Sequence, residues 1–569
     1  MSKSTKVICI MGLGIFLCML DTTVMNIALP AIQTGLGTDL AHLSWALNSY
    51  TILFASLTIP LGRFAELCGR TKVYLIGLGL FLLGSLCSGV ADSVIGLIVG
   101  RSIQSIGAAI VFPASMTIGI QAVPLAKRTG AIAILGVTQG LAAALGPTIG
   151  GVVTQQFGWR GIFLINLPLV AVALIGCWLF LDRKPVMSQT VKLDLVGSGL
   201  SMLTLAGLTL VLVKGGDWGW TSLAVIGLGL MSALALLVFV MVESKVAQPM
   251  IPLALFKNRQ FDGAAIVTII SGIFLVAFLV LMPSFFTKVQ NRSELMAALM
   301  ITPASIMIFG CSPVSGLLLT KVGPRTVVGL GSLLMIGGYW QLSVMDPNKY
   351  WQVMLAAILI GGGYGIVIGP ITVLAAADFT GDLLMASQSV IGVFRQIGTS
   401  LAVAIFVSAL STNLVTAKNQ IWQKAQKAVS TLAVSSKAKQ DTLTKVKAQL
   451  ASTNAPAKTV QPPITSNVEH QLIAANYAMA LKRQGLTDAP ITIKAQVHRK
   501  VSQAVTIQVH QTNQRLIPVV RKIKAQTKVE VTRAFIKPYK VALPFTVLML
   551  GTIGFFERRR DYSKTINHG

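Results

Sequence analysis

The sequence predicts an all-α integral membrane protein with fourteen transmembrane helices. Charged residues make up 12% of the 569 residues, about half the share of roughly 25% that is usual in soluble domains. Hydrophobic residues make up 53%, more than one or two soluble cores would bury. They gather in runs of about 20 residues, the length at which a helix crosses a bilayer. The composition therefore excludes a soluble globular enzyme.

Each apolar run is predicted to be a helix, because a bilayer offers the backbone no hydrogen-bond partners. The first run follows Lys3 and Lys6, as the apolar part of a secretory signal does. It continues past Asp21 to Pro30, so we interpret it as an uncleaved first helix. In chain order, the predicted spans are 7–30, 43–61, 73–90, 94–120, 131–156, 161–181, 194–213, 222–242, 263–286, 296–319, 326–344, 351–375, 386–411 and 539–556.

Lys and Arg are distributed unequally between the two sides of these spans. Outside the long segment 412–540, nineteen lie on the side of the amino terminus and five on the opposite side. Because short loops rich in Lys and Arg stay in the cytoplasm, both termini are expected there. The sequence thus predicts a multi-pass protein of the cell (cytoplasmic) membrane, embedded in the lipid bilayer.

The segment 412–540 carries 21 basic and 4 acidic residues, out of 47 and 19 in the whole chain. It is expected to be extracellular, since loops longer than about 60 residues translocate largely regardless of charge. One interpretation of its charge is a solvated helical face. The other is contact with anionic envelope polymers or lipid head groups. Because the charge gathers in this segment, no nucleic-acid partner is expected.

The same segment is predicted to be mostly helical. Leu443, Val446 and Leu450 have the spacing of one amphipathic helix. Apolar residues recur at every fourth position over 493–509, again as in a helix. Within 505–509 they also alternate with polar residues, which leaves a strand as the alternative there.

No cofactor or metal is expected. The six cysteines show no CxxC spacing, and none of the five histidines lies in the middle of a span. The chain has no glycine-rich phosphate-binding loop followed by a lysine, so ATP is not the expected energy source. His, Asp and Glu do not cluster within the spans, and an enzyme is therefore not expected.

A loop pattern occurs twice in the chain. Gly62 and Gly69 lie between spans two and three, and Gly316 and Gly323 lie at the same spacing between spans ten and eleven. Two six-helix halves separated by an inserted helix pair would place both loops equivalently. Internal repeats of this kind are how many secondary transporters build a binding site at the midplane.

Several motifs carry a resemblance to a known family. The loop after span two holds Gly62, Arg63, Glu66, Gly69, Arg70 and Lys72; span four holds Arg101, Gln104 and Gly107; span five holds Gly146, Pro147, Gly150 and Gly151; and span one holds the run from Leu20 to Pro30 with Asp21 and Asn26. Together these motifs resemble the Major Facilitator Superfamily, and within it the fourteen-helix drug:proton antiporters. Arg395, Gln396 and Gly398 in span thirteen extend the resemblance to the second half.

The spans and the repeated loop predict two six-helix bundles plus an inserted helix pair, with a long extracellular insertion before the last helix. The resemblance to fourteen-helix antiporters fits this arrangement. The expected domains are an N-terminal bundle over 1–185, an inserted pair over 186–245, a C-terminal bundle over 246–411 and 539–569, and a basic, mostly helical insertion over 412–538. It further implies a proton-coupled antiporter that exports amphiphilic small molecules, such as drugs, by alternating access. The proton gradient would then be the energy source.

Asp21 and Arg101 are the expected proton-coupling residues. Asp21 is the only carboxylate well inside a predicted span, where a charge costs about 2.5–3.5 kcal/mol on insertion scales. It must therefore face the bundle interior, be protonated, or form an ion pair. By its motif, Arg101 on span four is the expected partner. The alternative is a static pair that only locks two helices together.

Two further motifs have expected structural roles. Glu66, which stands where Asp is usual in the family, can pair with Arg63, Arg70 or Lys72, and the resemblance implies a conformational latch of Gly62, Gly69 and these four residues. Gly146, Pro147, Gly150 and Gly151 combine a kink with a face of small residues. The resemblance implies that this motif serves antiport, while close helix packing is the alternative explanation.

A substrate cavity is expected among polar residues of the spans, namely Asn26, Asn48, Tyr50, Gln104, Gln139, Gln388 and Arg395. Spans ten and thirteen contain no acidic residue. One acid and two arginines would repel a dication, so the expected substrates are monocationic, neutral or anionic amphiphiles. The alternative functions are export of a lipid or cell-envelope precursor, and a membrane sensor or scaffold with a transporter-like core.

Overall fold

The computed structural model describes residues 2–38, 40–124, 127–181, 194–246, 249–379, 381–431, 436–451 and 466–559. Inside these ranges the side chains of a few helical residues, Asn26 among them, lie outside the description. All regular secondary structure in the described ranges is helical. The predicted all-α class is therefore confirmed.

Thirteen helices of the described chain are long and apolar enough to cross a membrane. A fourteenth is obtained if Gly130–Ala142 and Leu145–Phe157, the two arms of a helix bent by 45°, count as one span. The bend lies just before Pro147, whose ring removes one backbone hydrogen bond from the helix. The predicted number of fourteen spans agrees with this upper count.

The first half of the chain forms nine helices within the described residues. They are α1 (Lys3–Leu36), α2 (Leu40–Cys68), α3 (Arg70–Gly89), α4 (Val94–Gln121), α5 (Arg128–Phe157), α6 (Gly161–Leu164), α7 (Asn166–Phe180), α8 (Leu195–Trp218) and α9 (Leu223–Glu243). The short α6 and the following α7 make up one candidate span.

The second half is also helical throughout its described residues. Its elements are η2 (Leu253–Lys257), α10 (Arg259–Lys288), α11 (Glu294–Val322), α12 (Pro324–Val344), α13 (Tyr350–Leu374), α14 (Gly381–Ala402), the π-helical turn η3 (Val403–Val407), α15 (Ser408–Ser430), α16 (Ser436–Ala451), α17 (Ser466–Arg483), α18 (Ile491–Thr546), α19 (Leu548–Gly551) and η4 (Thr552–Phe555).

The chain divides into two compact units. The first, called here the core unit, comprises Met1–Thr287, Arg292–Ala409 and Pro538–Gly569. The second, called here the 410–537 unit, comprises Leu410–Lys537 together with Lys288–Asn291. Whether the core unit consists of two six-helix bundles and an inserted pair stays a prediction.

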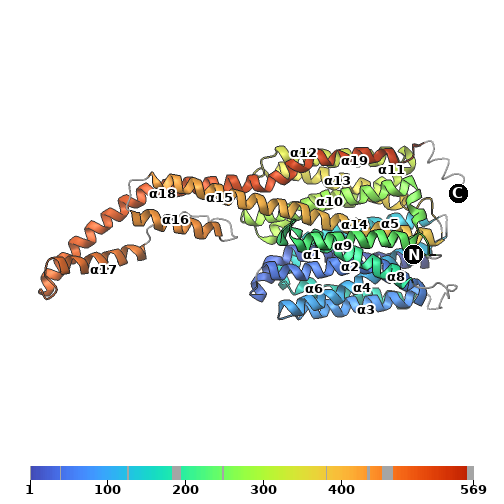
Figure 1. Cartoon of the computed structure of the whole chain (residues 1–569), viewed down its shortest axis with the longest axis horizontal. Helices are drawn as coiled ribbons and strands as arrows, with labels where there is room; N and C mark the ends of the chain where they lie inside the picture. Colours follow the sequence, from blue (N-terminus) through green and yellow to red (C-terminus); the bar gives the residue numbers. More distant parts are fainter. Residues whose placement is uncertain are drawn as a thin grey trace. The chain divides into compact units, whose positions relative to one another are not determined.

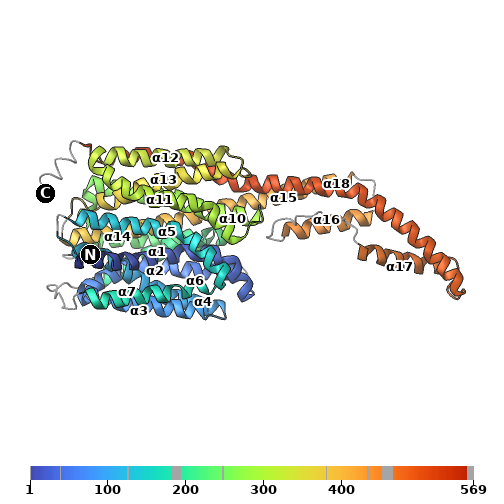
Figure 2. The same cartoon turned by 180° about the vertical axis from the view of Figure 1, so that it is seen from behind.

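Helices of the core unit run side by side in an apolar bundle (Figures 1 and 2). In its first half, α1 packs against α4, α5 and α7, and α4 also packs against α2 and α3. In its second half, α13 packs against both α11 and α12. Helix α5 joins the two halves, because it also contacts α11 and α13.

Helices α8 and α9 form a pair in which α8 makes the contacts to the rest of the bundle, chiefly to α2 and α14. Large apolar side chains of α9, such as Leu230 and Leu234, are exposed, as expected of a lipid-facing helix. That the pair is an insertion between two repeats stays a prediction.

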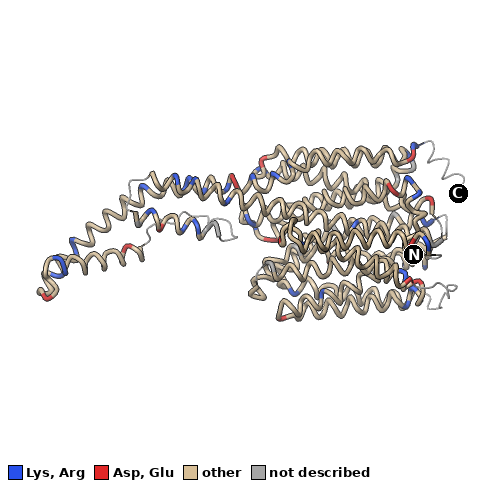
Figure 3. Tube along the Cα trace, viewed as in Figure 1, with Lys and Arg blue, Asp and Glu red and all other residues tan. Residues whose placement is uncertain are grey.

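Charged residues of the core unit lie mostly at the ends of its helices, with few in between (Figure 3). Lys214 lies near the end of α8 and is nevertheless buried, with a relative exposure of 3%. Its ammonium group donates to Ser44 at 2.7 Å and to Asp217 at 3.0 Å. Asp21, Arg101, Glu243 and Arg395 are the other buried charged residues of the described core unit.

The two repeated loops both have a positive φ at their second glycine, which alone separates two helices. Gly69 precedes α3 with φ of 95°, and Gly323 precedes α12 with φ of 86°. Positive φ in this range is accessible to glycine with little strain. The sequence echo therefore corresponds to a shared turn between helices.

The 410–537 unit contains two small apolar clusters. One gathers Ile421, Ala425, Val429, Val446 and Ile523, and the other gathers Ile473, Val505 and Val509. The helix predicted around Leu443 and Val446 is present as α16, whereas the side chain of Leu450 lies outside the described residues. The alternative of a strand at 505–509 is wrong, because these residues lie within α18 and bury one helical face.

We expect Ala425→Glu to destabilise the 410–537 unit by at least about 2 kcal/mol, because it buries an unpaired carboxylate. Ala425 is fully buried. Hydrogen exchange in the full chain should show loss of protection over 412–431 and in the α18 turns around Ile523.

The neighbouring Lys424→Gln is the matched control. It removes only the exposed ion pair with Glu530 at 2.8 Å, which is worth about 1 kcal/mol or less. Equal loss of protection in both variants would contradict the packing of this cluster.

Candidate functional site

Asp21 on α1 and Arg101 on α4 form an ion pair inside the core unit. The relative exposure of Asp21 is 4% and that of Arg101 is 1%. The guanidinium Nη1 donates to Asp21 Oδ2 and, at 2.7 Å, to Gln104 Oε1. The predicted partnership is therefore present as a direct, buried contact.

Three further polar side chains complete the surroundings of the carboxylate. Gln104 Nε2 donates to Asp21 Oδ1 at 2.9 Å and to Ser85 Oγ at 2.7 Å. Asn166 Nδ2 lies 3.4 Å from Asp21 Oδ1 and 3.2 Å from Ser85 Oγ. The cluster thus joins α1, α3, α4 and α7. Sequence reasoning missed Ser85 and Asn166 as site residues, although polar side chains within apolar spans are themselves a signal.

Aromatic rings cover the guanidinium of Arg101. Its Cζ lies 4.0 Å from the ring centroid of Tyr50 and 5.7 Å from that of Phe163. Such contacts are worth more when the cation is removed from water. The Tyr50 hydroxyl donates to the Cys18 carbonyl at 3.3 Å, and Ser105 donates to the Tyr50 carbonyl at 2.7 Å, so the ring itself is held in place.

A central cavity of about 70 Å³ lies between α1, α5, α10, α13 and α14. Its wall is mostly apolar, and its largest polar side chains are Gln139, Tyr364, Arg395 and Gln396. Ligand pockets usually measure roughly 300–1,000 Å³, so in this conformation the cavity is too small for an ordinary ligand. Met19, Thr22 and Thr23 of α1 line the wall, whereas Asp21 does not.

The residues predicted to form one substrate cavity lie in several places. Gln139 and Arg395 line the central cavity, while Tyr50 and Gln104 belong to the cluster around Asp21. Gln388 is buried and donates to the Thr372 carbonyl at 3.3 Å. Asn48 is half-buried on α2 and is not part of the cavity wall. The side chain of Asn26 lies outside the described residues.

The predicted latch residues meet at the junction of α2 and α3. Arg63 Nη1 donates to Glu66 Oε2 at 2.5 Å, and Arg70 Nη2 lies 3.6 Å from Glu66 Oε1. Lys72 is exposed, and no ion pair joins it to Glu66 in the described structure. These ion pairs are partly exposed, and such contacts are weak enough to break and re-form. Their role as a latch stays a prediction.

The glycine motif lies where α5 meets its neighbours. A methyl group at Gly146 would overlap the Thr23 side chain of α1, and one at Gly150 would lie 2.9 Å from the Val24 carbonyl. Gly151 instead faces α11, where a methyl group would lie 3.0 Å from Ala298 Cβ. Small residues thus let α5 approach α1 within a few residues of Asp21, as small-residue motifs do between membrane helices. A part in antiport beyond packing stays a prediction.

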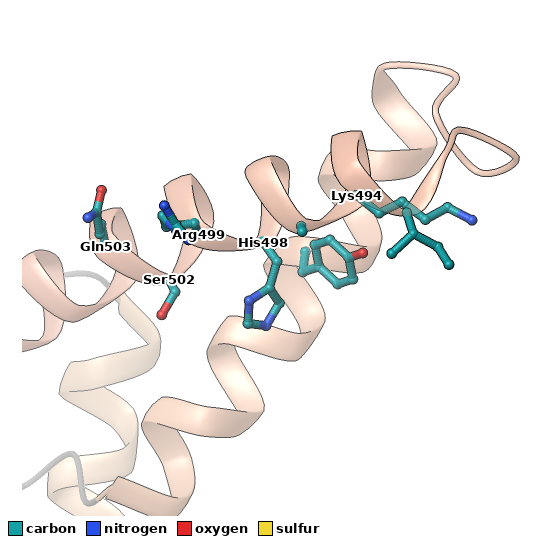
Figure 4. A pocket seen from close by; sticks show the side chains of 8 residues that line it. Lys494, His498, Arg499, Ser502 and Gln503 are labelled. Atoms are coloured by element: carbon teal, nitrogen blue, oxygen red, sulfur yellow. The ribbon is translucent and has the colours of Figure 1, made fainter.

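A second concavity is an open groove of about 670 Å³ in the 410–537 unit. Figure 4 shows Lys494, His498, Arg499, Ser502 and Gln503 along the first turns of α18. His498 packs edge-on against Tyr477 of α17, with ring centroids 5.0 Å apart. His498 and Arg499 are exposed and Lys494 is half-buried, so water screens much of their charge.

The buried ion pair, the paired loop glycines and the central cavity all lie within a region that matches a known protein family. The family model of the Major Facilitator Superfamily matches residues 11–403. The chain belongs to the Major Facilitator Superfamily. The matched region includes the Asp21 cluster and the cavity, and it ends before Leu410, where the main part of the 410–537 unit begins.

Relatives within the superfamily include several resistance proteins. Multidrug resistance protein Stp of Mycobacterium tuberculosis is 30% identical over 402 residues, which cover 70% of this chain and 74% of that protein. Multidrug transporter protein MdtP of Bacillus subtilis is 29% identical over a region that covers 73% of this chain and 78% of that protein. The methylenomycin A resistance protein of Streptomyces coelicolor is also 29% identical, over a region that covers 69% of this chain and 82% of that protein.

We expect Arg101→Gln to destabilise the core unit of this superfamily member by about 3–5 kcal/mol, because the buried Asp21 carboxylate would lose its countercharge. Asp21→Asn should have a cost of the same kind. The double variant should cost less than the two single variants together, since no unpaired charge remains. Thermal unfolding of the purified full chain compares the unsubstituted protein, the two single variants and the double variant. Strictly additive losses of stability would contradict a direct contact between Asp21 and Arg101.

Gly146→Ala should weaken the contact of α5 with α1 and lower the melting temperature, because its methyl group would overlap Thr23. Gly130→Ala in the same helix is the matched control, as a methyl group there meets nothing within 4 Å. It should be neutral or stabilising by up to about 1 kcal/mol. Equal effects of the two substitutions would contradict the close approach.

Proposed function

We propose that this chain exports amphiphilic small molecules, drugs among them, across the cell membrane in exchange for protons. The observation that carries the proposal is the buried Asp21–Arg101 pair on a helix that also lines a small, mostly apolar cavity. The resistance proteins among its relatives support drug export as the activity.

The coupling follows from the electrostatics of the cluster. Asp21 is 4% exposed and cannot exchange protons with water in this conformation. When α1 and α4 move apart, water reaches the carboxylate and a proton can bind. Protonation cancels the negative charge, so the attraction that holds Asp21 to Arg101 is lost. Release of the proton on the other side would restore the ion pair and the closed arrangement.

Substrate movement is proposed to follow from the contacts of α1. Thr22 and Thr23 lie on the cavity wall next to Asp21 in sequence, and Gly146 and Gly150 hold α5 against the same stretch of α1. Displacement of α1 on protonation would therefore change the cavity directly. Rocking of two helical bundles around a midplane site is the usual mode of alternating access.

The free energy of proton entry is large enough to drive export of a substrate against its concentration gradient. One charge that crosses 100 mV releases about 2.3 kcal/mol, which supports roughly a 50-fold gradient of a neutral substrate at one proton per molecule. Exchange of one proton for one monocation moves no net charge and would depend on the pH difference alone. The coupling ion is thus best tested with a neutral substrate.

We expect Asp21→Asn to abolish efflux of the neutral dye phenylnaphthylamine driven by a pH gradient in proteoliposomes of the full chain, because Asn cannot carry a proton. Fluorescence of the membrane-partitioned dye reports the transport. Downhill exchange of dye without a gradient should persist in the folded variant.

The control is Asp92→Asn, which makes the same chemical change in an exposed ion pair with Arg160 at 3.0 Å. Its efflux should match that of the unsubstituted chain. Gradient-driven efflux that survives in Asp21→Asn would remove Asp21 from the mechanism.

A further inference from the structure

Arg395 is a buried cation that has no counterion among the described residues. Its relative exposure is 8%, and neither its Nε nor its Nη1 has a hydrogen-bond partner in the structure. Arg101, the other deeply buried arginine, is instead paired with Asp21 and covered by Tyr50. The two arginines therefore differ in how their charge is compensated.

None of the residues that line the described cavity beside Arg395 is a carboxylate. The described cavity wall is built from α1, α5, α10, α13, α14 and η3, and its only other large polar groups are Gln139, Tyr364 and Gln396. Asp21 is engaged by Arg101 and is absent from the wall. Asp262 and Asp382 lie in the first turns of α10 and α14, and Asp382 is about 20 Å along its helix from Arg395 at 1.5 Å per residue.

This charge requires an anionic partner. A guanidinium stays protonated in proteins, and an uncompensated charge in a membrane interior is costly. Its planar fork binds carboxylate, sulfonate and phosphate oxygens through two hydrogen bonds. Gln396 Nε2 is also buried without a partner, and it lines the same cavity. Unused donors of both residues thus belong to one site.

The apolar part of the wall fits the rest of such a ligand. Leu275, Val276, Leu279 and Val280 of α10 line the cavity that Arg395 also lines. An amphiphile with one negative group would place that group at the guanidinium and its apolar body along α10. The cavity of about 70 Å³ is too small for it, so the ligand binds in a wider conformation.

We infer that the central cavity is an anion subsite, and that the chain prefers amphiphiles carrying one negative charge. Arg395 and Gln396 would bind the negative group of such a molecule. This inference rests on the proposed export function. It narrows the substrate class from amphiphiles in general to organic monoanions. Exchange of one proton inward for one monoanion outward moves two charges, so voltage alone should drive it more steeply than export of a neutral molecule.

The test uses two probes that share one skeleton. Anilinonaphthalene sulfonate is phenylnaphthylamine with one added sulfonate group. In proteoliposomes of the full chain, half-saturation for the sulfonate should occur at a concentration at least tenfold lower than for the neutral dye. An imposed potential without a pH difference should accelerate export of the sulfonate more than export of the neutral dye.

Substitution at Arg395 should weaken binding of the anion more than binding of the neutral dye. Arg395→Gln should lower the ratio between the half-saturation concentrations of the neutral dye and the sulfonate at least tenfold, whereas Arg395→Lys should restore most of this preference. Lys214→Gln is the matched control, because it also removes a buried cation of the core unit, at a position outside the cavity. It should leave the ratio between the two probes unchanged.

Stability gives a readout that does not depend on transport. Without ligand, Arg395→Gln should melt at or above the temperature of the unsubstituted chain, since it removes an uncompensated charge, whereas Arg101→Gln should melt below it. The sulfonate should raise the melting temperature of the unsubstituted chain and not that of Arg395→Gln. A loss of stability in Arg395→Gln equal to that in Arg101→Gln would overturn the inference, because Arg395 would then have a structural partner.

The outcomes separate this inference from the proposed function. If the neutral dye is exported in an Asp21-dependent manner but the sulfonate is not preferred, the anion subsite is wrong and proton-coupled export stands. If Arg395→Gln impairs both probes equally, Arg395 supports the fold or the transport cycle instead of binding an anion. If neither probe is exported, the proposed function itself fails.

Discussion

The contact between Asp21 and Arg101 is the interaction on which the core unit depends. A lone carboxylate within a membrane helix is costly, and this one is tolerated because Arg101, Gln104 and Asn166 satisfy it from two other helices. The same contacts draw α1, α4 and α7 together around Ser85 of α3. The proposed coupling of a proton to a change of shape rests on this contact, because a proton on Asp21 would remove the charge that holds it to Arg101.

The structure separates the acid from the cavity. Asp21 faces the cluster on α4, whereas its neighbours Thr22 and Thr23 face the central cavity. Helix α1 therefore has one face toward the Asp21 cluster and another toward the cavity. Glycines of α5 pack closely against α1 at Thr23 and Val24, next to Asp21 in sequence. In the proposed mechanism, substrate and proton would therefore act on opposite sides of one helix, and their movements could be linked through α1 without direct contact between them.

The sequence was sufficient for the class of the fold and for its central contact. Runs of apolar residues predicted the spans, because a bilayer dictates helix length and backbone pairing. The motif around Arg101 pointed to Asp21, and the contact is present. The cavity wall was harder to predict. Tyr50 and Gln104 were expected there but belong to the Asp21 cluster, whereas Tyr364 and Gln396 line the cavity and were not expected there. In a tightly packed bundle most helix faces meet another helix, so polarity alone does not reveal which face borders an interior space. The lack of a partner for Arg395 likewise becomes visible only when its neighbours are placed.

The small size of the central cavity has a consequence for how a ligand would act on the protein. A space of about 70 Å³ lies well below the roughly 300–1,000 Å³ of ordinary ligand pockets, so an amphiphile does not fit in this conformation. A ligand that binds only wider forms shifts the population toward them. Any amphiphile that occupies the cavity would therefore also change the shape of the helical bundle around it.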